Sequence, residues 1–186
     1  MKIGITGSHG SGKTCLASGA VELVIKTGGS VTLIPEVARR VIALGLPLNE
    51  DARLESYYRY VQLQLESERL ATTTDVISDR TLVDLLAYVE VNNDRRIPGG
   101  FVDMLREIVR REAAYYDLHC YLPLEFELEV DGVRSADRLY QSAVDSRILE
   151  IIQRFGLPFV TIRGPLARRC EALSQIVRDV SRSDDE

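Results

Sequence analysis

The feature that most constrains the fold of this chain is a glycine-rich segment near its amino end. It matches the pattern GxxxxGK[ST], follows the short apolar run Lys2–Ile5 and leads into a segment of helical period. Strand, loop and helix therefore occur in the order that a phosphate-binding loop requires. The residues expected to bind a nucleotide are Gly7, Ser8, His9, Gly10, Ser11, Gly12, Lys13 and Thr14.

Each position of this loop has a chemical reason. Glycines let backbone amides curl around a β-phosphate, and the amino end of the following helix adds its dipole. Lys13 is expected to reach the β- and γ-phosphates, and Thr14 to ligate Mg²⁺. His9 occupies a variable position of the motif and is expected to be a solvated side chain. The loop thus predicts a site for ATP and Mg²⁺.

The rest of the chain alternates β-branched runs with longer segments of helical period, which is typical of a parallel sheet with crossover helices. The predicted strands are Lys2–Ile5, Val31–Ile34, Asp75–Ser78, Asp117–Leu122 and Pro158–Arg163. Helices are predicted near 13–27, 36–45, 50–73, 81–91, 101–115, 136–155 and 166–181. In the third, Asn49 is expected to cap the helix, with Leu54, Tyr58, Val61 and Leu65 on its apolar side.

Length and composition indicate one globular domain. The chain has 186 residues, of which 45% are hydrophobic and 27% charged, and a core is expected over residues 1–180 with a flap or lid at about 125–140. An acidic tail, 181–186, follows. No apolar run reaches membrane length and no signal peptide is apparent, so we expect a cytoplasmic protein without a membrane partner.

The number and spacing of the cysteines and histidines and the net charge argue against further classes of protein. Three cysteines without CxxC spacing and two histidines argue against a structural zinc site or a disulfide framework. The net charge of −5 argues against a protein that coats nucleic acid, although a local basic patch on an acidic body can still bind DNA.

The end of the third predicted strand separates the kinds of phosphate-loop protein. The base-specifying NKxD motif of GTPases is absent, and Asp79 is followed by Arg80 where a motor ATPase is expected to carry a glutamate. The chain is also too short for the extra helical domain of ring-forming ATPases. Phosphoryl transfer to a bound acceptor is therefore favoured over simple hydrolysis.

At this strand end the chain resembles a known group. Asp79-Arg80-Thr81 and the following Leu82–Tyr88 are similar to the DRS-like element of deoxynucleoside kinases. Nearly the whole chain, with a lid-like segment at 131–138 and a fifth strand after 156, resembles the ribosylnicotinamide-kinase-like, AAA-type group of small bacterial and phage proteins, which is related to nucleoside and nucleoside-monophosphate kinases. The resemblance implies a three-layer α/β P-loop NTPase fold with a five-stranded parallel sheet of order 2-3-1-4-5, helices on both faces and a small lid.

The same resemblance implies roles for residues at the strand ends. Glu36 is expected to accept the proton of the acceptor hydroxyl or to orient it, the alternative being a charge in the first turn of the next helix. Asp79 is expected to hold Mg²⁺ or to act as the base instead, and Arg80 to face the acceptor; a helix cap or a salt bridge is the alternative. Asp84, three residues after Thr81, has the spacing of a capping box and is expected to be structural.

Further basic residues are expected at the rim. Arg134 and Arg138 are four residues apart and resemble lid arginines that stabilise the transferring phosphoryl group; surface ion pairing is the alternative. Arg163 and Gly164 follow the fifth strand, where this fold cradles adenine, or form an ordinary turn.

Three functions remain. The first is an ATP-dependent kinase for a nucleoside-like or nucleotide-like acceptor. The second is a phage-type DNA kinase that phosphorylates hydroxymethylated pyrimidines such as 5-hydroxymethyluracil, with Arg39-Arg40 and Arg95-Arg96 at the entrance. The third is a nucleotide-gated regulatory ATPase module. The acceptor, the donor base and the oligomeric state are left open by the sequence.

Overall fold

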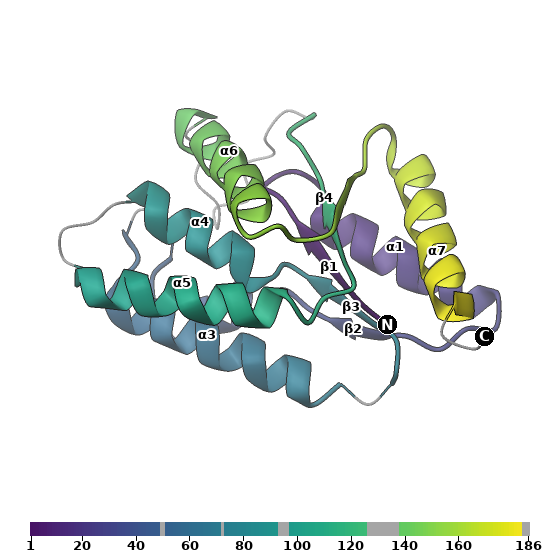
Figure 1. The fold of residues 1–186 in the computed structure, drawn as a ribbon, viewed down its shortest axis with the longest axis horizontal. Helices are drawn as coiled ribbons and strands as arrows, with labels where there is room; N and C mark the ends of the chain where they lie inside the picture. The colour runs from purple at the N-terminus through teal and green to yellow at the C-terminus, as the bar shows by residue number, and fades with distance from the viewer. Residues whose placement is uncertain (49–50, 72, 93–96, 126–137, 184–186) are drawn as a thin grey trace.

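A single parallel sheet forms the centre of the molecule. The computed structural model describes residues 1–48, 51–71, 73–92, 97–125 and 138–183, and within them five strands lie in the order β2-β3-β1-β4-β5 (Figure 1). The strands are β1 (Lys2–Thr6), β2 (Thr32–Ile34), β3 (Val76–Asp79), β4 (Leu118–Tyr121) and β5 (Phe159–Thr161). All four neighbouring pairs are parallel, so the predicted strands and their order are confirmed.

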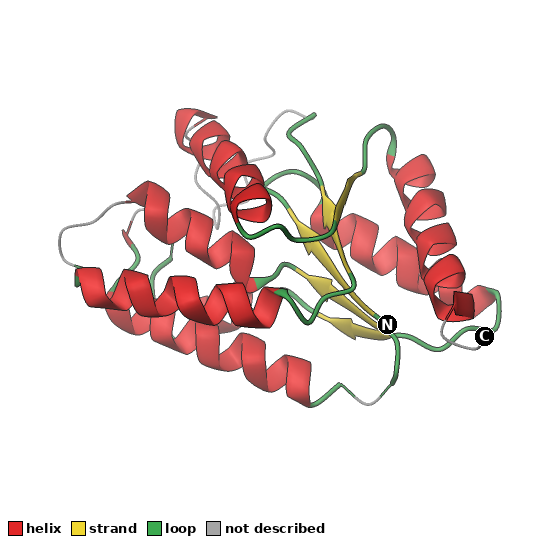
Figure 2. Ribbon diagram, viewed as in Figure 1, coloured by secondary structure: helices red, strands yellow, loops and turns green. Residues whose placement is uncertain are grey.

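Helices cover both faces of the sheet. They are α1 (Lys13–Lys26), α2 (Ala38–Ala43), α3 (Leu54–Arg69), α4 (Leu82–Asn92), α5 (Gly99–Ala113), α6 (Arg138–Arg154) and α7 (Leu166–Ser183). Figure 2 shows α1 and α7 on one side of the strands and α3, α4, α5 and α6 on the other. The predicted three-layer α/β architecture is therefore confirmed.

The alternation of side chains along β1 explains the two layers. Ile3 and Ile5 are fully buried in the cluster formed with α1 and α7. Gly4 faces the opposite layer, where a Cβ atom would lie 2.4 Å from Thr81 Cγ2. Every residue of β3 is also buried, so both of these strands are covered on both faces, as expected in the middle of a parallel sheet.

Helix α3 begins later than the sequence predicts. Its amino-terminal cap is Arg53, whose backbone is extended (φ −119°, ψ 165°) and whose N–H donates to Ser56 Oγ at 3.3 Å. The buried face is also different, because Tyr57, Tyr60 and Leu63 point inward while Tyr58 is half exposed. The prediction of Tyr58 on the buried side was wrong, because Tyr57 and Tyr60 are the residues that pack into the cluster with α4 and α5. Asn49, the predicted cap, lies outside the described residues.

Three segments at the same edge of the sheet carry the predicted site. The phosphate loop follows β1, Glu36 follows β2, and Arg80 follows β3. Since carboxyl ends of parallel strands meet at one edge, these segments converge although they are far apart in sequence. The predicted lid, about 125–140, lies largely outside the described residues. None of the helices in the described part of the chain has both the length and the apolar character needed to cross a membrane.

Candidate active site

The phosphate loop joins β1 to α1 in a conformation that glycine makes possible. Gly12, the residue before α1, has a φ of +88°, in the left-handed region. At Gly7 the backbone passes so close to the end of β4 that a Cβ atom would lie 2.5 Å from the Leu122 carbonyl oxygen. The loop borders a pocket of about 300 Å³ whose lining is Gly10, Gly12, Lys13, Thr14, Cys15 and Arg80.

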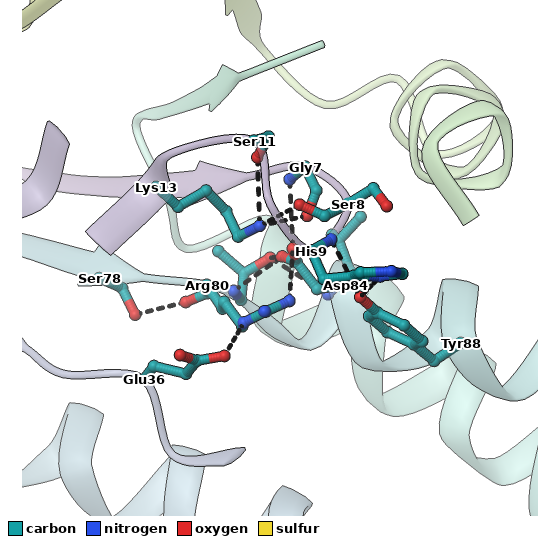
Figure 3. Close-up of polar contacts among 12 residues, drawn as sticks. Gly7, Ser8, His9, Ser11, Lys13, Glu36, Ser78, Arg80, Asp84 and Tyr88 are labelled. Atoms are coloured by element: carbon teal, nitrogen blue, oxygen red, sulfur yellow. Dashed lines mark hydrogen bonds and ion pairs between the residues drawn. The ribbon is translucent and has the colours of Figure 1, made fainter. Parts of the chain in front are cut away.

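Lys13 folds back over its own loop. Its Nζ donates to the carbonyl oxygens of Gly7 and Ser8, both at 2.6 Å, and to Ser11 Oγ at 3.3 Å (Figure 3). The side chain is buried, and this burial, assisted by the charge of Arg80, lowers the pKa of Lys13 to about 7. A phosphate in the adjoining pocket would favour the charged form of Lys13, because its negative charge replaces the stabilisation by water that burial removes.

Thr14, which lines this pocket, contacts Asp79 at the end of β3. The Thr14 hydroxyl donates to the Asp79 carboxylate, while burial raises the pKa of Asp79 above its ordinary value. Asp79 Oδ1 is buried and accepts no hydrogen bond within the described residues. A hydroxyl and a carboxylate are the oxygen ligands that Mg²⁺ uses beside phosphates, so the pair fits this ion.

No larger metal-binding cluster accompanies this pair. Within the described ranges, no group of three or more His, Cys, Asp or Glu side chains is placed to hold a metal ion. A Mg²⁺ ion held by Thr14 and Asp79 would therefore take its other ligands from phosphate oxygens and water, as it commonly does in phosphoryl-transfer sites.

Arg80 is the most constrained residue of the site. It has a φ of +82°, which is unusual for a residue with a side chain, and its carbonyl accepts from Ser78 Oγ at 2.6 Å. Its Nε donates to Glu36 Oε1 at 2.5 Å, and its Nη1 lies 3.9 Å from Asp84 (Figure 3). Burial opposes the charge of Arg80, yet Glu36 and its other neighbours hold its pKa well above the ordinary value.

A second, larger pocket lies on the other side of Arg80. It is the larger of the two by its empty space, about 580 Å³ including the part that is open to solvent, and its walls are mainly aromatic and aliphatic. Its lining is His9, Glu36, Ala38, Arg39, Ile42, Leu48, Tyr57, Tyr60, Arg80, Leu85 and Tyr88. Arg80 lines both pockets and thus stands between the phosphate loop and this second, mainly apolar pocket.

The side chain of His9 is buried, in contrast to the prediction from the sequence. It is 1% exposed, its N–H donates to the Tyr88 hydroxyl at 3.1 Å, and its ring Nδ1 lies 3.0 Å from the same oxygen. Its carbonyl accepts from Gln141 of α6 at 2.7 Å. The prediction of a solvated side chain was wrong, because α4 and α6 close over this part of the loop, and His9 faces the larger pocket.

Asp84 has a wider structural role than its capping spacing indicated. It accepts the N–H of Thr81 at 3.0 Å, as the capping box predicts. Its other oxygen accepts the N–H of Gly7 at 3.2 Å. The first turn of α4 therefore holds the start of the phosphate loop as well as its own end.

The remaining predicted residues lie at the rim or outside the described residues. Arg163 is exposed and pairs with Glu125 at 3.1 Å, while the N–H of Gly164 donates to the other oxygen of Glu125 at 2.8 Å. Arg138 is exposed at the first position of α6. Arg134 lies outside the described residues.

One residue of the site region was missed by the sequence reasoning. Arg169 of α7 is 1% exposed and donates to the Ser11 carbonyl of the phosphate loop at 3.0 Å. Its neighbour Arg168 is exposed, and nothing local distinguishes the two arginines. Only the packing of α7 against α1 shows which of them points inward.

The sheet order and the loop between β1 and α1 define a P-loop protein with the fold of nucleoside and nucleotide kinases. The chain belongs to an AAA domain family, whose model matches residues 2–169. No curated protein is similar enough in sequence to match the chain.

Several solved structures share this fold. A deoxyadenosine kinase from M. mycoides, with the products dCMP and dCDP bound, matches with a TM-score of 0.64 and 15% identity over 97% of this chain and 100% of that one. A thymidylate kinase from Ehrlichia chaffeensis matches with a TM-score of 0.66 and 17% identity over 96% and 98%. The NadR protein in complex with NR matches with a TM-score of 0.73 and 19% identity, over 94% of this chain and 50% of that chain.

Proposed function

We propose that this protein is an ATP-dependent phosphotransferase that transfers the γ-phosphate to a hydroxyl of a nucleoside-like or nucleotide-like acceptor. The observation that carries the proposal is the position of Arg80 in the wall shared by the two pockets. One pocket borders a phosphate loop, and the other is apolar with a few convergent polar groups. A donor in the first and an acceptor in the second would meet at the arginine.

On the donor side, the loop amides and Lys13 bind the β- and γ-phosphates. Thr14 and Asp79 hold Mg²⁺, which neutralises phosphate charge when it is bound. Arg80 lies against the γ-phosphate from the acceptor side, where its charge stabilises the equatorial oxygens as the phosphoryl group moves. Arg138 and Arg134 act as lid arginines in this proposal, and the loop at Arg163 and Gly164 receives the adenine.

On the acceptor side, the buried rings of Tyr57 and Tyr60 and the ring of Tyr88 form walls on which a base can stack. Glu36 orients the acceptor hydroxyl and takes its proton. The hydroxyl oxygen forms the new bond to the γ-phosphorus, the bond to the bridging oxygen breaks, and ADP leaves. The γ-phosphate of the donor and the hydroxyl of the acceptor would then both lie beside Arg80.

The charges at the shared wall favour an uncharged acceptor. Glu36 already pairs with Arg80 at 2.5 Å, and Arg39 lies 3.7 Å from the same carboxylate. A phosphate on the acceptor would compete with Glu36 for both guanidinium groups and leave a carboxylate beside it. We therefore expect a nucleoside to be a better acceptor than its monophosphate.

The relatives support this reading only through their fold. The ligands bound in those structures, dCMP, dCDP and NR, belong to the nucleotide- and nucleoside-like class that the larger pocket is proposed to take. For a DNA acceptor, Arg40 donates to Ser67 of α3 at 2.9 Å, and Arg95 and Arg96 lie outside the described residues. No observation on the described residues favours DNA or a regulatory module over the kinase.

The test is to follow the label from γ-labelled ATP with Mg²⁺ in the presence of nucleosides, nucleoside monophosphates or DNA with and without hydroxymethylated pyrimidines. We expect label on a nucleoside. Label found only as free phosphate, or left in ATP with every acceptor, would contradict the proposal, and label on DNA alone would overturn the small-molecule acceptor.

A pair of variants then tests the site itself. Glu36→Gln should lower kcat by about 10² or more while leaving the Kd for ATP unchanged, because the lost carboxylate acts on the acceptor. Glu66→Gln, the same substitution on the exposed side of α3, is the matched control and should leave kcat unchanged. Equal kcat values for the two variants would show that Glu36 is no more than a helix charge.

A further inference from the structure

Arg169 is a buried cation behind the phosphate loop. It reaches the loop from α7, which packs beside α1 (Figure 1). Its Nη1 donates to the Ser11 carbonyl at 3.0 Å, its Nε to the Gly164 carbonyl at 2.6 Å, and its Nη2 to Glu125 Oε2 at 2.6 Å. One side chain thus ties together the phosphate loop, the loop after β5 and the segment after β4.

The hydrogen bond to the Ser11 carbonyl bears on the orientation of the peptide unit between Ser11 and Gly12. In a trans peptide unit the C=O and the following N–H point in opposite directions. Ser11 is fully buried and is not part of the lining of the phosphate pocket, whereas Gly12 is. Arg169 does not line the pocket either, and a Ser11 oxygen held on the side of Arg169 would leave the Gly12 N–H on the side of the pocket.

The surroundings of Gly12 place Arg169 directly behind this amide. A Cβ atom built on Gly12 would have Arg169 Nη1 as its nearest neighbour, at 4.0 Å. The guanidinium is 1% exposed, so little water screens its charge from the loop. Glu125, at 22% exposure, is its counter-ion on the outer side.

We propose that Arg169 is a positioning residue of the phosphate site, which orients the Gly12 N–H toward a bound polyphosphate by holding the Ser11 carbonyl from behind. The inference rests on the proposed function only in taking a polyphosphate as the ligand of the loop. It assigns to α7 a part in nucleotide binding that does not touch the nucleotide. The role fits a buried arginine that bonds three separate segments of the chain.

The test compares Arg169→Lys with Arg106→Lys in the full chain. Arg106 also donates to a carboxylate, Glu90, but lies in the opposite helix layer, so it is a matched control for the loss of a guanidinium. Kd values for inorganic tripolyphosphate, ATP and adenosine would be measured by calorimetry on protein shown to be folded by circular dichroism. We expect Arg169→Lys to weaken tripolyphosphate about ten-fold and ATP by at least that factor. Adenosine reports separately on the loop at Gly164, which Arg169 also contacts.

A second readout separates positioning from stability. The ¹H–¹⁵N signal of Gly12 should shift on addition of tripolyphosphate in the parent protein and shift less in Arg169→Lys, while Arg106→Lys behaves like the parent. An unchanged Kd for tripolyphosphate in Arg169→Lys, or equal losses in the two variants, would overturn the inference. If the parent protein itself bound no polyphosphate, the proposed donor site would fail, which is a different result.

Discussion

At the scale of single residues, burial decides the chemistry of the phosphate loop. Burial removes Lys13 from water, and this burial together with the charge of Arg80 lowers the pKa of Lys13 to about 7. Arg80 carries its charge in a similarly buried position because Glu36 and Asp84 surround it. The two cations of the site therefore differ, since one can lose its proton near neutrality and the other cannot.

This difference predicts proton uptake when a nucleotide binds. At pH 8 the buried Lys13 is largely neutral, because its pKa of about 7 lies below that pH, and a bound polyphosphate restores the charged form. Calorimetry of ATP binding at pH 8, in two buffers of different ionisation enthalpy, should show uptake approaching one proton. In Lys13→Arg the uptake should vanish, since arginine stays charged. Enthalpies that do not depend on the buffer would contradict the prediction.

At the scale of elements, the contact between α1 and α7 is set by small side chains. Gly19 lies on the face of α1 that meets α7, and a Cβ atom there would be 2.6 Å from Cys170 Sγ. Cys170 is itself buried beside Leu173 and Leu16 in the same cluster. This close approach also brings Arg169, the residue before Cys170, to the phosphate loop.

The packing at Gly19 predicts that an alanine there changes the free energy of unfolding in the direction opposite to the one that helix propensity predicts. Gly→Ala within a helix ordinarily stabilises by about 1 kcal/mol. Gly19→Ala should instead lower the free energy of unfolding by about 1–3 kcal/mol, because the new methyl group overlaps the Cys170 sulfur. Urea denaturation would measure the change. The double variant Gly19→Ala, Cys170→Ala should be more stable than the sum of the single changes predicts, and strict additivity would refute the steric explanation.

At the scale of the whole molecule, Glu90 links three helices of one layer. Its side chain is 2% exposed and accepts from Arg106 of α5 at 2.7 Å and from Arg147 and Arg154 of α6 at 3.0 and 3.2 Å. Burial opposes the charge of this carboxylate, but the three guanidinium groups together hold its pKa below the ordinary value. The cluster supports the layer in which the larger pocket is formed.

Removing the charge of Glu90 should therefore destabilise the fold in a pH-dependent way. Glu90→Gln should lower the free energy of unfolding by about 1–3 kcal/mol at pH 7, measured by urea denaturation. Since the folded pKa is depressed, this contribution is present above the unfolded pKa and is lost as pH falls through the folded value. The difference between the variant and the parent should shrink on acidification. A difference independent of pH would mean that the charge contributes nothing.

Local patterns in the sequence predicted the ends of the strands well. The phosphate loop, Glu36 and Asp79-Arg80 could be found because each immediately follows a run of β-branched and apolar residues. The helix starts were less predictable, as α3 shows: Asn49 looked like a cap, yet Arg53 and Ser56 form it. The cap is a local contact between residues three positions apart, but arginine is not among the residues that favour this position, so the sequence carries no signal for it.

The sequence by itself determined the sheet-and-helix alternation and the phosphate loop, because these depend on residue periodicity and on short motifs read over a few positions. The tertiary structure decided that Arg80 stands between two pockets, that His9 is buried against Tyr88, and that Arg169 holds a loop 158 positions away. Such contacts join side chains that are distant in sequence, and their partners are selected by the packing of whole helices against the sheet. No local pattern distinguishes the buried Arg169 from the exposed Arg168 beside it.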